Sequence, residues 1–336
     1  MGFLSRNLGI DLGTIYIRVF SNNQLVLEEP TIAAIVVEED KMVEWGKAAQ
    51  EMYGRVSESI EVSRPMTNGV IADFEVTGNI LADVLKRVGG MVRLFRPNVM
   101  ITAPEGITSV ERRAVHEVAL QAGSGEVYVI QQPLAASLGV DLPIGTPSGN
   151  MILCLGGGTT QAAVLAMYGI VAAETLRSGG IQLDESIVNY VRKKYRLIIG
   201  QTTAEQIKIK IGAAIQLPEE ASLEIQGQDQ VTGLPRPVML TTGEIVDAME
   251  EPLRAIVETS RKTLEKTPPE LVSDIIDRGV ALCGGGALLR GIDKLLTKEL
   301  GVPAYLVDNP TTCVAQGAAR GLAMYPLIRR NLYQVN

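Results

Sequence analysis

Cysteine and histidine are scarce in this chain of 336 residues. Three cysteines occur, Cys154, Cys283 and Cys313, and they are far apart in the sequence without any Cys-x-x-Cys pair. This spacing implies neither a disulfide framework nor a zinc site, and it fits a reducing compartment. The single histidine, His116, stands in a helical run, and we interpret it as a solvated helix residue because a catalytic histidine needs positioned partners.

Long apolar runs and an excess of basic charge are missing as well. No stretch of about 18 apolar residues occurs, and residues 1–7 are too few for the apolar region of a signal peptide. The formal net charge of −7 argues against broad electrostatic binding of nucleic acid, which needs a basic face. We therefore expect a cytoplasmic protein that does not bind nucleic acid.

The sequence contains an internal repeat. With a hydrophobic content of 46%, the chain can bury large cores, as one big domain or as two connected halves. Residues 8–14 are echoed by residues 151–159, and in both copies an apolar run ends in a Gly/Thr turn and a second apolar run follows. This pattern predicts two β-hairpins, one in each of two α/β halves, with their turns facing each other across a cleft.

A third glycine cluster spans residues 283–291 and follows an apolar strand pattern at residues 279–282. A strand, a glycine turn and a helix start together let a ligand approach the backbone closely. Helices are predicted at residues 107–122, 134–138, 183–195 and 242–267, and a turn-rich link between the halves at residues 141–149.

These glycine turns suit a nucleoside triphosphate. Such a ligand needs several inward-pointing N–H donors, a hydroxyl group and a magnesium ion held by oxygen ligands. One hairpin would contribute Gly13, Thr14 and Ile15, and the other would contribute Gly156, Gly157, Gly158 and Thr159. A single glycine-rich turn would be weak support, but three in this order, two of them in a duplicated hairpin, are much more specific.

Several sequence blocks resemble the MreB family of bacterial actin-like proteins. They are residues 9–14, 69–74, 133–136, 156–160, 203–208, 231–235, 267–270 and 284–291, and the likeness extends from about residue 8 to residue 323. The resemblance implies an actin-like α/β fold of two lobes with duplicated ribonuclease-H-like cores around an ATP site. It also implies head-to-tail protofilaments paired antiparallel, direct membrane binding, and a role with the cell-wall elongation machinery at the inner membrane face.

The resemblance further implies positions for the subdomains and the site. Subdomain IA would comprise residues 1–32, 67–145 and 318–336, IB residues 33–66, IIA residues 146–182 and 244–317, and IIB residues 183–243. The nucleotide-binding residues implied, in addition to those of the two turns named above, are Tyr16, Glu205, Gln206, Ile207, Lys208, Gly284, Gly285, Gly286 and Ala287. Asp11 would support magnesium through water, and Gln132 would position the attacking water.

The chain departs from the family pattern where carboxylates are usual. Cys154, Gln161, Gln131, Gln132 and Ile181 stand at such positions, and Lys210 replaces a glutamate. A thiol is a poor partner for magnesium, and removing one positioned group typically costs about 10²–10³ in rate. We therefore expect slow or absent ATP turnover with nucleotide binding retained. A stronger alternative is a structural paralogue that binds no nucleotide.

A segment at residues 89–97 carries Met91, Val92, Leu94 and Phe95 among two arginines. Its counterpart in the family inserts into the membrane, and apolar side chains with arginines near lipid head groups suit an interfacial anchor. Burial under the adjacent helix is the alternative. A sugar kinase of the same superfamily would share the glycine hairpins but needs a catalytic aspartate, and a seventy-kilodalton chaperone would need a further peptide-binding domain.

Overall fold

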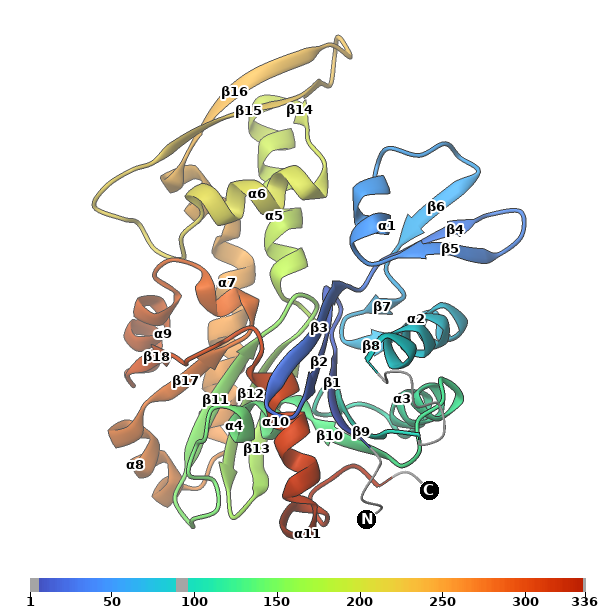
Figure 1. Cartoon of the computed structure of the whole chain (residues 1–336). Helices are drawn as coiled ribbons and strands as arrows, with labels where there is room; N and C mark the ends of the chain where they lie inside the picture. Colours follow the sequence, from blue (N-terminus) through green and yellow to red (C-terminus); the bar gives the residue numbers. More distant parts are fainter. Residues whose placement is uncertain (1–5, 89–95, 335–336) are drawn as a thin grey trace.

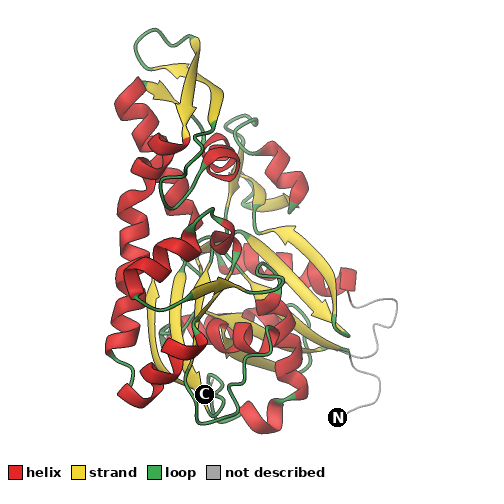
Figure 2. Ribbon diagram, turned by 90° about the vertical axis from the view of Figure 1, so that its left-hand side faces the viewer, coloured by secondary structure: helices red, strands yellow, loops and turns green. Residues whose placement is uncertain are grey.

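Two five-stranded sheets form the centre of the molecule, and a smaller three-stranded sheet stands above each of them (Figure 1). The computed structural model describes residues 6–88 and 96–334. We call the half built on the first large sheet lobe one and the half built on the second lobe two. In the side view of Figure 2 the small sheet of lobe two stands at the top, well separated from the large sheets below.

The large sheet of lobe one has the strand order β10-β9-β1-β2-β3. Its strands are β1 (Asn7–Leu12), β2 (Tyr16–Ser21), β3 (Gln24–Pro30), β9 (Asn98–Ala103) and β10 (Val127–Gln131). The first three are antiparallel, and β9 and β10 run parallel to β1. Asn22 and Asn23 both have positive φ, which matches the two-residue hairpin turn between β2 and β3.

The large sheet of lobe two repeats this arrangement with the order β13-β12-β11-β17-β18. Its strands are β11 (Asn150–Leu155), β12 (Thr160–Ala166), β13 (Gly169–Leu176), β17 (Val280–Cys283) and β18 (Ala304–Leu306). Again three antiparallel strands are followed by two that are parallel to the first. The predicted hairpins are β1–β2 and β11–β12, and the duplicated α/β core is confirmed.

Helices cover the outer faces of both sheets. Lobe one is covered by α2 (Phe74–Val88) and α3 (Ser109–Gln121), and lobe two by α5 (Gly180–Tyr195), α7 (Thr242–Glu265), α8 (Pro269–Arg278) and α9 (Ile292–Leu300). These include three of the helices predicted from the sequence, and the fourth is α4 (Gln132–Gly139). Capping boxes at Thr108 and Thr241 fix the starts of α3 and α7.

The smaller sheets contain the remaining strands. In lobe one β4 (Ala33–Val36), β5 (Lys41–Trp45) and β6 (Ile60–Ser63) pack with α1 (Lys47–Met52), and a short hairpin joins β7 (Met66–Thr67) to β8 (Val70–Ile71). In lobe two the small sheet consists of β14 (Leu197–Ile198), β15 (Ser222–Asp229) and β16 (Pro235–Thr241), and it lies beside α6 (Gln201–Ile211).

Two helices, α4 and α10 (Cys313–Ala323), cross between the lobes, and α11 (Tyr325–Ile328) follows α10. At the crossing a Cβ atom on Gly317 would lie 1.6 Å from the carbonyl oxygen of Ala135, and one on Gly139 would lie 1.9 Å from that of Cys313. Only glycine allows the two backbones to approach so closely. The two helices therefore cross in backbone contact, within a buried core that both lobes share.

Successive side chains of a strand point to opposite faces of the sheet, and this determines which side chains of β1 and β11 face the helix crossing. Leu8, Ile10 and Leu12 belong to the outer core of lobe one, so Asp11 points toward the other face of the sheet. In lobe two Cys154 belongs to the core between the lobes, on the side of α4 and α10. Asp11 and Cys154 thus occupy corresponding places in the two halves.

Among residues 6–88 and 96–334, no helix combines the length and apolar character needed to cross a bilayer. The proposed membrane residues Met91, Val92, Leu94 and Phe95 lie outside the described part of the chain. Their role stays a prediction.

Candidate functional site

A cavity of about 440 Å³ lies between the lobes, a volume typical of small-molecule sites. Lobe one contributes the β1–β2 turn, and lobe two contributes the β11–β12 turn, the start of α5, one face of α6 and the loop after β17. The structure brings most of the predicted site residues to its walls: Asp11, Gly13, Thr14, Ile15, Tyr16, Gln132, Gly156, Gly157, Gly158, Thr159, Glu205, Lys208, Gly284, Gly285 and Gly286.

The two glycine turns close in the same way. The N–H of Gly13 donates to the carbonyl of Tyr16 at 3.1 Å, and the N–H of Gly156 donates to that of Thr159 at 2.8 Å. The turns also touch, because a Cβ atom on Gly157 would lie 2.0 Å from Cγ1 of Ile15. The backbone of the second turn thus packs against the side chain of Ile15 in the first turn, and this contact requires glycine at position 157.

Each turn is anchored from behind. Thr14 Oγ1 accepts a hydrogen bond of 2.9 Å from the N–H of Gly69. The first two N–H groups of α5, from Gly180 and Ile181, donate to the carbonyls of Gly156 and Gly157 at 3.0 and 2.9 Å. The beginning of α5 therefore holds the second turn in place.

Asp11 is the buried carboxylate of the cavity floor. It accepts hydrogen bonds from Thr102 Oγ1 at 2.9 Å and from Gln132 Nε2 at 3.4 Å. Burial raises the pKa of Asp11, and the positive charge of Arg18, its cross-strand partner on β2, opposes that rise. No group of three His, Cys, Asp or Glu side chains able to hold a metal occurs in the described residues. One carboxylate fits a magnesium ion that is held mainly by water and phosphate oxygens.

The matching place in lobe two is neutral. Cys154 lies opposite Cys283 on the neighbouring parallel strand, and their sulfur atoms are 3.3 Å apart. The hydrogen bond with Cys154 raises the pKa of Cys283, and the one with Cys283 raises that of Cys313. Three cysteines that are far apart in the sequence therefore meet as buried thiols, a poor environment for a hard cation.

The face of α6 that lines the cavity carries Glu205 and, three and four residues later, Lys208 and Ile209; Gly212, directly after the helix, also lines the cavity. Gln206 is exposed and Ile207 is fully buried in the core of lobe two, so the structure places neither of these predicted residues on the cavity wall. Lys210 is exposed and also off the wall.

An ion pair at the cavity edge was not foreseen from the sequence. Lys208 Nζ lies 2.7 Å from Oδ1 of Asp184 and donates to the carbonyl of Gly180 at 3.0 Å. Burial raises the pKa of Asp184 to about 6, while the charge of Lys208 opposes the shift. Asp184 stands one helical turn after Gly180, so a turn-by-turn reading of this helix would have placed it near the second glycine turn.

The loop after β17 forms the far wall. Gly284 has φ of +86°, and a Cβ atom there would lie 2.3 Å from the carbonyl oxygen of Leu155. Gly285 begins a short 3₁₀ helix, η1 (Gly285–Leu288), within which Ala287 is buried and off the cavity wall.

Several further lining residues were not predicted from the sequence to belong to the site. They are Arg18, Gly69, Gly180, Leu183, Asp184, Ile209, Gly212, Leu288, Leu289, Arg290, Thr311 and Val314. Arg18 could have been found from strand alternation, because it lies opposite Asp11 in the first hairpin. Thr311 and Val314 come from a distant segment that no local pattern links to the turns.

Known proteins resemble this chain along nearly its whole length. The family model described as MreB/Mbl protein matches residues 5–329. The cell shape-determining protein MreB of Escherichia coli K12 is 41% identical over 338 residues, which covers 99% of this chain and 97% of that protein. The cell shape-determining protein Mbl of Bacillus subtilis is 40% identical over 314 residues, 93% of this chain and 94% of that protein.

Solved structures of similar fold also include an MreB protein. MreB5 of Spiroplasma citri bound to ADP superimposes with a TM-score of 0.91 at 32% identity, covering 98% of this chain and 99% of that one. The AMPPNP-bound form of that protein gives a TM-score of 0.92 at 31% identity. MamK in a double helical filament shares the fold, with a TM-score of 0.80 at 22% identity over 95% of this chain and 99% of that one.

Proposed function

This chain belongs to the MreB/Mbl family, and on that premise we propose that it is an ATP-binding cytoskeletal protein that forms filaments and helps to determine cell shape. The observation that carries the proposal is the pair of touching glycine turns at the wall of the interlobe cavity. The nucleotide part is supported by the Spiroplasma citri relative, which is described bound to ADP and to AMPPNP.

In the proposed mechanism the N–H groups of the two turns surround the phosphates, with Thr14 and Thr159 as neighbouring hydroxyls. Bound magnesium would neutralise charge on the phosphates, and Asp11 is the carboxylate placed to hold its water ligands. Gln132 lies beside Asp11 and would orient the attacking water without removing its proton. Glu205 and Lys208 would face the ribose and base, with Gly284 to Gly286 on the adenine side.

Turnover should be slow. The floor of lobe two presents the thiol of Cys154, and lobe one presents the amide of Gln132, where the family pattern has carboxylates. A second candidate function, a structural paralogue that polymerises without hydrolysis, is favoured by these same neutral side chains.

The cellular role follows from the relatives named cell shape-determining proteins. We propose head-to-tail filaments of this chain at the inner membrane face, working with the cell-wall elongation machinery. Met91, Val92, Leu94 and Phe95 would provide the lipid contact, by analogy with the family's insertion loop. The division into subdomains IA, IB, IIA and IIB, with the boundaries given above, belongs to this proposal.

Three measurements test the proposal. Titration with a fluorescent ATP analogue and Mg²⁺ should show saturable binding, and sedimentation should show polymer that increases with ATP or liposomes. Binding of no nucleotide together with no sedimentation under any condition would refute it. Phosphate release by the wild type should be slower than release by a Cys154→Asp, Gln132→Glu double variant, and equal rates would contradict the slow-turnover part.

A further inference from the structure

A buried glutamine of lobe two, Gln161, has its side-chain amide oriented by the backbone of lobe one. The N–H of Glu105 donates to Gln161 Oε1 at 2.8 Å. A peptide N–H is only a donor, so the oxygen of the amide must face it and the NH₂ group must face the other way. Gln161 is 1% exposed, so water does not compete for this contact.

The NH₂ group of Gln161 then determines the orientation of a second amide. Gln161 Nε2 donates to Gln132 Oε1 and to Thr159 Oγ1, the latter at 3.3 Å. Because its oxygen faces Gln161, Gln132 directs its own NH₂ group at Oδ1 of Asp11, at 3.4 Å. An ionised carboxylate only accepts hydrogen bonds, so the contact with Asp11 requires the same orientation of the Gln132 amide as the contact with Gln161. We call the series of hydrogen bonds from Glu105 through Gln161 and Gln132 to Asp11 the relay.

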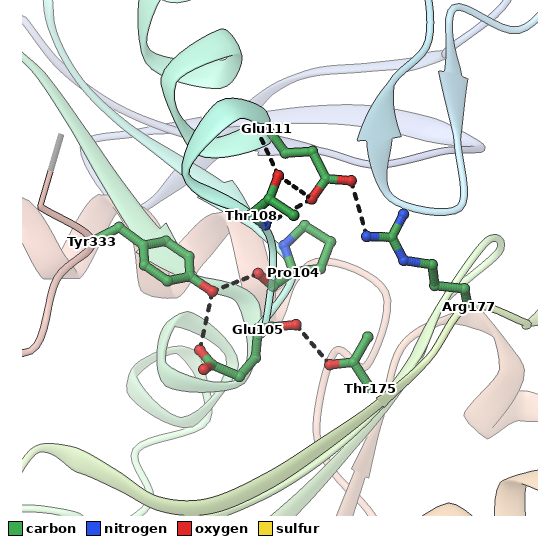
Figure 3. Close-up of polar contacts among 7 residues, drawn as sticks. All are labelled: Pro104, Glu105, Thr108, Glu111, Thr175, Arg177 and Tyr333. Carbon is green, nitrogen blue, oxygen red and sulfur yellow. Dashed lines mark hydrogen bonds and ion pairs between the residues drawn. The ribbon is translucent and has the colours of Figure 1, made fainter.

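The relay crosses between the lobes, since Gln161 belongs to lobe two and Glu105, Gln132 and Asp11 to lobe one. Further hydrogen bonds hold Glu105, the first residue of the relay, in place. The carbonyl of Glu105 accepts from Thr175 Oγ1 on β13 at 2.8 Å, and Tyr333 donates to Pro104 O at 2.8 Å and to the Glu105 carboxylate at 3.2 Å (Figure 3).

An ion pair next to this contact also spans the lobes. Arg177 lies 2.9 Å from the carboxylate of Glu111, whose other oxygen caps the start of α3 through Thr108 (Figure 3). The segment that donates to Gln161 is therefore fastened to lobe two on one side and to the C-terminal tail on the other.

We propose that Gln161 is a positioning residue for nucleotide hydrolysis, which fixes the side-chain amide of Gln132 with its nitrogen toward Asp11 and its oxygen toward lobe two. This inference rests on the proposed nucleotide-binding function. The two ends of a glutamine amide have nearly the same shape but opposite hydrogen-bonding character, so an unrestrained Gln132 would present either end to a water molecule. The relay selects which end of the Gln132 amide faces Asp11.

The relay also gives a physical reason for the amides at positions 132 and 161 to occur together. A glutamate at position 161 could still accept from the Glu105 N–H, but it could not donate to Gln132 Oε1. Gln132 would then turn its NH₂ group toward position 161 and its oxygen toward the Asp11 carboxylate, where the two acceptors repel each other. An acid at position 161 is therefore incompatible with a glutamine at position 132 in the orientation seen here.

The test compares Gln161→Glu and Gln161→Leu with the wild type and with the control Gln226→Glu. Gln226 is exposed on β15, in the small sheet of lobe two, and is off the cavity wall. Single-turnover phosphate release with excess protein and titration with a fluorescent ATP analogue are measured for each. Both Gln161 variants should lose about tenfold or more in turnover, with less than about a threefold change in Kd. The control should match the wild type in both.

A double-mutant cycle separates positioning from a general structural effect. In a Gln132→Leu background, Gln161→Glu should cause no further loss of turnover, because there is no amide left to orient. If Gln161→Leu fails to fold, Thr175→Val serves as the second variant. It loosens Glu105 without touching the cavity, and it should lower turnover in the same direction.

The outcomes are distinct. Unchanged turnover in the Gln161 variants, equal losses with and without Gln132, or a wild type that binds nucleotide but never hydrolyses it would each overturn the inference and leave nucleotide binding standing. A wild type that binds no nucleotide would overturn the proposed function, and the inference would fall with it.

Discussion

Replacing Gly157 by alanine should separate the two glycine turns. The new Cβ atom would lie 2.0 Å from Cγ1 and 3.1 Å from Cβ of Ile15. Carbon atoms in contact are normally about 3.5–4.0 Å apart, so the gap must open by about 1.5 Å. A new rotamer of Ile15 can move Cγ1, but its Cβ is fixed to the backbone, so part of the shift must come from the hairpins themselves.

Two effects of Gly157→Ala are expected. Overpacking of this kind typically costs about 1–3 kcal/mol in the free energy of unfolding. If the turns part, at least one N–H group loses its phosphate oxygen. A charge-assisted hydrogen bond of about 1.5–3 kcal/mol corresponds to a rise in the Kd for ATP of about 10- to 150-fold.

Titration with a fluorescent ATP analogue and thermal unfolding measure the two effects. Gly200→Ala is the matched control, because Gly200 has φ of −81°, nothing lies within 4 Å of its added Cβ, and it is off the cavity wall. Ile15→Ala in the Gly157→Ala background should restore part of the lost stability. A Gly157→Ala protein that binds ATP and melts like the wild type would refute the argument that the turns touch.

Three further predictions follow from buried groups. The folded-state pKa of Asp184, about 6, is above its ordinary value of 3.8, so between these two pH values the folded protein binds more protons than the unfolded chain. The free energy of unfolding should therefore rise as the pH falls from 7 toward 4, by up to about 3 kcal/mol from this group. Urea unfolding of Asp184→Asn should lack this component, and an unchanged pH dependence would contradict it. Gly317→Ala should give insoluble or strongly destabilised protein, because its Cβ would lie 1.6 Å from the carbonyl oxygen of Ala135. A soluble variant with the wild-type melting temperature would show that the helix crossing tolerates a side chain. Thr14→Val should lower the free energy of unfolding by about 1–3 kcal/mol in chemical denaturation, because the buried N–H of Gly69 loses its acceptor, and no loss would mean that water replaces it.

The sequence predicted the hairpins and the main helices because these depend on local pattern. The repeat at residues 8–14 and 151–159 locates both hairpins, and the structure confirms their antiparallel pairing. The lobes and their duplicated topology could be expected from the same repeat together with the family resemblance.

Other features depend on long-range contacts that spacing does not encode. Cys154 and Cys283 meet only because β11 and β17 pair in parallel with those residues in register. Gln161 and Glu105 come together across the lobe boundary, so neither could be assigned a role from its neighbours in the sequence. The helical period separates Gln206 and Ile207 from Glu205 and Lys208, although all four residues belong to one block that resembles the family.

The corresponding places of Asp11 and Cys154 have a consequence for the chemistry of a bound anion. Asp11 is paired across its hairpin with Arg18, and Cys154 is paired across its own with Gln161. Duplication gave both halves the same scaffold, but only one half carries a carboxylate and a guanidinium at this pair of positions. A polyphosphate lying between them would meet a carboxylate and a guanidinium at this place in lobe one, and a thiol and an amide at the matching place in lobe two. The pseudosymmetry of the backbone therefore does not extend to the charges beside the two turns.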